Sequence, residues 1–94
     1  MGVAFYWARN DGIGGHVWMR EDDLRALTDE MLVQGMPWPA DRVASGNAIE
    51  ADELEAVLEP AVAEPQLLAD VKLWRDWLVF LDGAARNGGL LITP

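Results

Sequence analysis

The sequence predicts an α+β fold in which a small two- or three-stranded sheet, drawn from both chain ends, packs against helices on one face. Three observations support this prediction. β-like segments stand near both ends of the 94 residues, amphipathic helical patterns fill the middle, and glycine or proline clusters separate them. The length suits a single domain over residues 1–94, and a 51% hydrophobic share suffices for a modest core. The expected order is β-β-α-α-α-β.

The first two strands are expected at residues 3–8 and 16–19. Three consecutive aromatic side chains in the first segment favour a strand. Alternation directs Val3, Phe5 and Trp7 toward the core. The opposite face of the strand then carries Ala4, Tyr6 and Ala8. Three glycines and an Asn-Asp pair predict that residues 10–15 form the turn of a hairpin.

The middle of the chain contains three helical patterns. Residues 22–34 have apolar side chains at three- and four-residue spacing, and Gly35 provides a stop. Residues 50–59 form a short acidic helix. Residues 65–86, with Pro65 in the first turn, form the longest helix and the centre of the core. Its apolar stripe consists of Leu67, Leu68, Val71, Trp74, Trp77, Leu78, Phe80, Leu81 and Ala85.

The remaining segments connect these elements and complete the sheet. The chain is expected to be loop from residue 36 to residue 47, with Trp38 held in an extended segment between two prolines. Glycines at 88 and 89 end the long helix, and residues 90–93 form a last short strand. The two terminal strands are expected to be neighbours, in either relative direction.

The charge is strongly acidic and unevenly distributed. Sixteen acidic and seven basic side chains give a net charge of −9, and residues 43–71 contain seven acidic side chains without a basic one. Such a chain repels phosphates, so no nucleic acid is expected as a partner. No apolar stretch is long enough to predict a membrane span. The absence of cysteine and of a signal-peptide pattern predicts a cytoplasmic protein.

The sequence contains no recognisable catalytic or metal-binding motif. His16 is the single histidine; Asp11 or Asp22 could orient it as a general base, but no nucleophile can be assigned, so a surface histidine is the preferred interpretation. We therefore expect a protein that is not an enzyme and that uses neither a cofactor nor a metal. The glycines beside His16 are read as a hairpin turn, because no helix or lysine follows as in a phosphate-binding loop.

The first functional hypothesis is a small acidic interaction protein, such as an inhibitor, an immunity-like protein or an accessory protein. It would bind another protein, with a basic surface, through its acidic face. The competing interpretation is that the charge run is simply a solvated face. Trp38 is interpreted either as a lid over the core or as an exposed anchor. The residues expected to contact the partner are Trp38, Asp52, Glu53, Glu55 and Glu59.

The alternative hypothesis is a small-molecule-binding protein. Its aromatic pocket would lie between the sheet and the long helix, lined by Trp7, Trp74 and Trp77. These rings could equally well form an aromatic core. A homodimer is a further expectation, because small residues on the open sheet face, Ala4 and Ala8 beside Tyr6, would let a second sheet approach.

Overall fold

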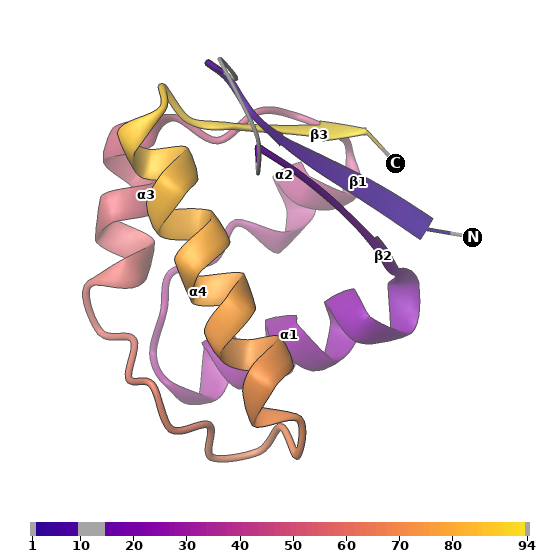
Figure 1. Cartoon of the computed structure of the whole chain (residues 1–94), viewed down its shortest axis with the longest axis vertical. Helices are drawn as coiled ribbons and strands as arrows, with labels where there is room; N and C mark the ends of the chain where they lie inside the picture. The colour runs from indigo at the N-terminus through magenta and orange to yellow at the C-terminus, as the bar shows by residue number, and fades with distance from the viewer. Residues whose placement is uncertain (1, 10–14, 94) are drawn as a thin grey trace.

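The computed structural model of the chain describes residues 2–9 and 15–93, and shows an antiparallel sheet packed against helices (Figure 1). The strands are β1 (Gly2–Trp7), β2 (His16–Arg20) and β3 (Leu90–Thr93). Their order is β2-β1-β3, so the strand nearest the N-terminus is central. The prediction that the terminal strands are neighbours is confirmed, and they run antiparallel. Most of the predicted turn, residues 10–14, lies outside the described residues.

The strand register separates the sheet into an inner and an outer face. Phe5 pairs with Val17 on one side and with Ile92 on the other, and Val3 pairs with Met19. Val3 and Phe5 are buried, as the alternation predicted. We call the opposite side the outer face; its residues are Gly2, Ala4, Tyr6, His16, Trp18, Arg20, Leu91 and Thr93.

The helices are α1 (Glu21–Val33), α2 (Ala40–Ala44), α3 (Ala51–Leu58) and α4 (Val71–Arg86). The first and third agree with the expected helices to within one residue at each end. Gly35 has a φ of 78°, which is the left-handed conformation expected of a glycine stop. The short helix α2 was not predicted, and the expectation of loop throughout that segment was wrong.

The longest helix begins later than its apolar pattern predicted. Residues 65–70 are irregular, and α4 starts only after Asp70, whose side chain accepts a hydrogen bond from the amide of Leu73 at 3.0 Å. Pro65 is therefore not in the first turn of a helix, and Leu67 is exposed. The amides of residues 66–68 donate to Glu30 of α1, so they are satisfied without a helix, and the helix begins only where Asp70 caps it.

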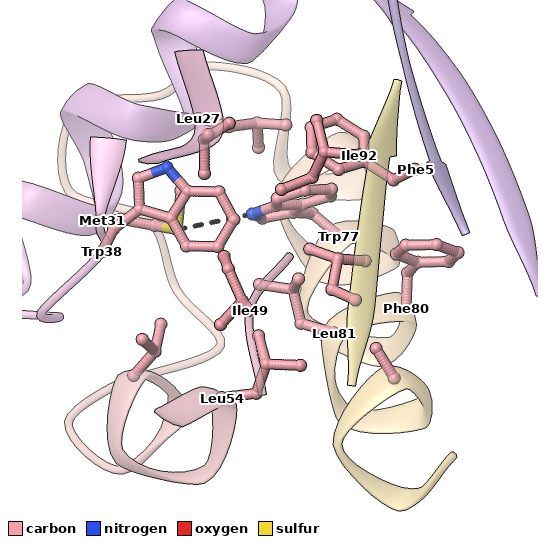
Figure 2. Close-up of a cluster of buried hydrophobic side chains, with 14 of the residues drawn as sticks. Phe5, Leu27, Met31, Trp38, Ile49, Leu54, Trp77, Phe80, Leu81 and Ile92 are labelled. Atoms are coloured by element: carbon pink, nitrogen blue, oxygen red, sulfur yellow. Dashed lines mark hydrogen bonds between the residues drawn. The ribbon is translucent and has the colours of Figure 1, made fainter. Parts of the chain in front are cut away.

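The predicted central role of α4 is confirmed, because this helix supplies the centre of the core, although Val71 of the predicted stripe is exposed. Trp74 and Leu81 are completely buried. In Figure 2, side chains of α4 meet Phe5 and Ile92 from the sheet, with Leu27 of α1 and Ile49 and Leu54 nearby. The sheet, α1, α3 and α4 thus share one hydrophobic core.

Candidate functional site

The exposed side of α3 carries three carboxylates in one row. Leu54 and Val57 are buried, so the helix turns its opposite side to solvent. Asp52, Glu55 and Glu59 lie on that exposed side, three and four residues apart. We call these three residues the acidic stripe. No ion pair joins any of them to another described residue.

The fourth predicted acidic residue of this helix has a different environment. Both carboxylate oxygens of Glu53 accept hydrogen bonds from the guanidinium of Arg42 in α2, one of them at 2.9 Å. A bidentate ion pair of this kind fixes the relative position of the two side chains. Glu53 therefore connects α3 to α2, and much of its charge is neutralised.

The end of α3 makes the acidic stripe electrostatically unfavourable for the helix itself. The C-terminus of a helix carries the negative end of its dipole, and basic side chains stabilise it. Here the last turn contains Glu55, the capping position is Glu59, and the last turn contains no basic residue. Two of the three stripe carboxylates thus stand where a helix would prefer positive charge.

A hollow of about 450 Å³ lies beside the acidic stripe, between α3 and α4. It is lined by Glu55, Leu58, Glu59, Asp82, Ala85 and Arg86. Leu58 and Ala85 are partly buried against the core and give the hollow an apolar portion. Arg86 pairs with Asp82 at 3.1 Å, one turn earlier on α4. The hollow therefore combines an apolar portion with two carboxylates of the stripe.

Trp38 lies in the core and not on the surface. Only 6% of it is exposed, and its ring meets that of Trp77 edge-on at a centroid distance of 5.7 Å. Figure 2 shows it over the buried side chains of α1 and α4. This position agrees with a lid over the core, and the alternative of an exposed anchor is wrong. Its buried indole nitrogen has no hydrogen-bond partner among the described residues.

The three tryptophans of the alternative hypothesis are fixed by hydrogen bonds. The indole of Trp7 donates to the carbonyl of Phe80 at 3.0 Å, and that of Trp74 donates to the carbonyl of Val62 at 2.8 Å. The indole of Trp77 donates to the sulfur of Met31 at 3.5 Å, drawn as a dashed line in Figure 2. Trp7 and Trp77 pack against Phe80, and Trp77 also meets Phe5 of the sheet. Trp74 is instead directed to the segment before α4.

A small recess remains beside these rings, between β2 and α4. Its volume is about 60 Å³. Its lining consists of Val17, Met19, Leu73, Asp76, Trp77 and Phe80. Small-molecule sites usually have volumes of roughly 300–1,000 Å³, so this recess gives the aromatic pocket no support. Binding of a small molecule at Trp7, Trp74 and Trp77 stays an untested prediction.

One carboxylate that the sequence analysis did not single out is completely buried. The side chain of Glu30 accepts hydrogen bonds from the amides of Gln66, Leu67 and Leu68 at 2.8, 2.6 and 2.7 Å. Gln34 donates to the same carboxylate at 2.8 Å. Burial acts to raise the pKa of Glu30, but these hydrogen bonds outweigh it and lower the pKa to about 2.

A sequence signal for this buried carboxylate existed. Glu30 lies three residues after Leu27 and directly before Met31, both of which are buried on the apolar side of α1. A charged side chain within an apolar stripe predicts either a break in the stripe or a buried, hydrogen-bonded group. The second case applies here, and the carboxylate organises the segment that leads into α4.

His16 lies exposed on the outer face, where its ring meets that of Tyr6 at a centroid distance of 4.7 Å. The described residues contain no group of three or more histidine, cysteine or acidic side chains that could hold a metal ion. No helix within the described part of the chain has the length and apolarity needed to cross a membrane. Comparisons with protein-family models, curated proteins and solved structures gave no match.

Proposed function

We propose that this protein is a non-catalytic interaction domain that binds a basic surface of another protein through the acidic stripe. The observation that carries the proposal is that Asp52, Glu55 and Glu59 are exposed in one row and form no ion pair with any described residue. Arg86, which lines the same hollow, is paired with Asp82. Electrostatic complementarity of this kind accelerates association and selects the partner. An inhibitor, an immunity-like protein or an accessory subunit would all use such a face.

The position of the carboxylates supports binding over mere solubility. Solubility requires charge anywhere on the surface, whereas Glu55 and Glu59 stand where the helix dipole disfavours them. Residues that reduce stability without a structural benefit are typical of functional surfaces. We therefore favour a docking role for the stripe over the interpretation as a solvated face.

The hollow between α3 and α4 suits a long basic side chain of a partner protein. Lysine and arginine place an apolar stem on apolar surface and keep the charged end near carboxylates. Leu58 and Ala85 could receive such a stem, and Glu55 and Glu59 could receive the charge. We thus expect a partner with a lysine or arginine that enters this hollow. The lack of cysteine suits a cytoplasmic setting for this interaction.

The test is affinity capture from the native host with wild-type protein and with the double variant Glu55→Gln/Glu59→Gln. We expect the variant to lose the partner, and wild-type binding to weaken as salt is raised. The charge-matched control is Asp23→Asn/Asp29→Asn on α1, which removes two exposed carboxylates distant in sequence from the stripe. Both double variants preserve side-chain shape.

Equal capture by wild type and the stripe variant would refute the docking face. Equal loss in both double variants would show that only net charge matters, and would also contradict the proposal. Glu53 is left unchanged in this experiment, because its replacement would also release Arg42 and disturb the contact between α2 and α3.

A further inference from the structure

The two edges of the sheet differ in whether another segment of the chain pairs with them. On β3, the backbone of Leu90 exchanges two hydrogen bonds with Ile49, at 2.8 and 2.9 Å, so another segment covers part of this edge. On the other side, β2 pairs with β1, and the described residues provide no strand beyond it. Open edges invite pairing with a further strand.

The direction of the backbone groups on β2 follows from the ladder. The amide of Trp7 donates to the carbonyl of Gly15 at 2.9 Å, which identifies a hydrogen-bonded pair. Such pairs alternate along an antiparallel ladder, so Val17 and Met19 bond to β1. His16, Trp18 and Arg20 therefore direct their amides and carbonyls to the open edge.

We propose that a second copy of the chain adds its own β2 to this edge, with a twofold axis at Trp18, and forms a six-stranded sheet. The five residues of β2 are self-complementary for this pairing. Trp18 faces Trp18 of the second copy, and His16 faces Arg20 of the second copy. Each residue whose amide and carbonyl point to the open edge then faces another residue of the same kind, as the antiparallel hydrogen-bonding pattern requires.

Charge favours this edge over other surfaces of the molecule. Two copies that each carry −9 repel one another at most approaches. The residues of β2 and of the outer face include no carboxylate, and they present His16 and Arg20. The nearest carboxylates in sequence are Glu21 and Asp22, which follow β2 in the chain and share a hollow with Trp18 and Arg20. The acidic stripe lies on α3, which stands on the opposite side of α4 from β2 in Figure 1. Edge pairing keeps the two stripes apart.

Side chains on both faces of β2 suit the added strand. On the outer face, Trp18 is 57% exposed, and its ring lies over Gly2 of β1. The twofold axis would place the two Trp18 residues opposite each other, as a cross-strand pair whose rings would have to turn from Gly2 toward the axis to make contact. On the inner face, Val17 and Met19 line the recess between β2 and α4, in whose described lining Asp76 is the one charged residue. Val17 and Met19 of the second copy would extend this apolar layer.

The size of the contact predicts a weak dimer. A strand of five residues is about 17 Å long, and such an edge buries less than the roughly 800 Å² per partner of a standard stable interface. We therefore expect the mass in sedimentation equilibrium to rise from 10.4 kDa toward about 21 kDa as concentration increases from about 5 to 500 µM. Added salt should strengthen the association, because it screens the net charge.

Two variants test the edge against a matched control. Trp18→Lys places a charge at the axis and should weaken the dimer by at least about tenfold. Trp18→Pro should do the same, because it removes an amide that points away from β1. The control is Leu91→Lys, on the outer face of β3. It should leave an edge-paired dimer intact and should break a dimer formed by stacking two outer faces through Tyr6 and its neighbours.

Amide hydrogen exchange gives a readout of the pairing itself. The amides of His16, Trp18 and Arg20 should become protected with rising protein concentration in wild type but not in Trp18→Lys, while β1 amides stay protected in both. A mass of 10.4 kDa at every concentration would overturn the proposal and leave the edge to a strand of another protein. Loss of the dimer in Leu91→Lys, or no concentration-dependent protection, would also overturn it.

Discussion

Glu30 and the acidic stripe place the same chemical group in opposite environments. Glu30 is buried and accepts four hydrogen bonds, three of them from consecutive backbone amides. Asp52, Glu55 and Glu59 are exposed and have no ion-pair partner among the described residues. The difference separates carboxylates that hold the fold together from carboxylates that are available to a partner, although composition counts both as acidic residues.

The conformation of the segment between α3 and α4 depends on Glu30 and on the side chains near it. Glu30 binds residues 66–68, the side-chain oxygen of Gln34 accepts from the amide of Val62 at 2.8 Å, and Trp74 donates to the carbonyl of Val62. Substitutions of these buried residues should therefore reduce the free energy of unfolding, whereas substitutions in the acidic stripe should affect binding.

The largest expected effect is that of Trp74→Ala. This change removes a completely buried ring and its hydrogen bond to Val62, so the free energy of unfolding should fall by about 3–5 kcal/mol. Urea titration monitored by circular dichroism measures it. A loss below about 1 kcal/mol would contradict the central position of α4 in the core.

Acid should destabilise the fold through Glu30. The pKa of Glu30 is lowered to about 2 in the folded protein, from an ordinary value of 4.5, so the ionised form stabilises the fold. This contribution is complete above pH 4.5 and is lost as the pH falls toward 2. It amounts to about 3 kcal/mol for a shift of this size. Urea titrations between these pH values check it, and Glu30→Gln should flatten the dependence.

At neutral pH, matched variants compare the two environments directly. Glu30→Gln should lower the free energy of unfolding by about 2 kcal/mol, because the amide cannot replace a charged acceptor for three backbone donors. Glu55→Gln should change it by less than about 0.5 kcal/mol, as expected for an exposed side chain. Equal losses in chemical denaturation would show that the two environments do not differ as described.

One small expected effect has the opposite sign. Glu59→Lys places a cation at the C-terminal end of α3, where the helix dipole favours it, and should raise the free energy of unfolding by about 0.3–1 kcal/mol. The same variant should weaken partner capture if the stripe is the docking surface. Thermal unfolding at low ionic strength measures the first effect; a lower melting temperature would contradict the account of the helix end.

The elements that periodicity defines could be predicted from the sequence. The spacing of Trp74, Trp77 and Leu81 gave the buried side of α4, and the alternation of Val3 and Phe5 gave the inner face of β1. The late start of α4 could not be found in this way. It is linked to hydrogen bonds between Glu30 and amides 36 to 38 residues further along the chain. The spacing of apolar residues within one segment cannot predict pairs so distant in sequence.

The candidate site was predictable only in part. The exposed positions of Asp52, Glu55 and Glu59 follow from the helical phase that Leu54 and Val57 set. The pairing of Glu53 with Arg42 was not predictable, because it requires α2, a single short turn of helix without an apolar stripe of its own. The burial of Trp38 likewise depends on the arrangement of the α1–α2 connection over Trp77.

The central position of β1 has a consequence for the order in which the protein can fold. Tyr6 and Trp7 pair with Leu91 and Leu90, and the indole of Trp7 bonds to Phe80, 73 residues away. β3 is the last of these elements to leave the ribosome, so β1 has only its hairpin partner β2 until then. Closing contacts of such long sequence separation slows folding. Until β3 has been synthesised, the aromatic strand β1 therefore has one edge whose backbone groups are unpaired. Chaperones would recognise such an exposed strand edge in the nascent chain.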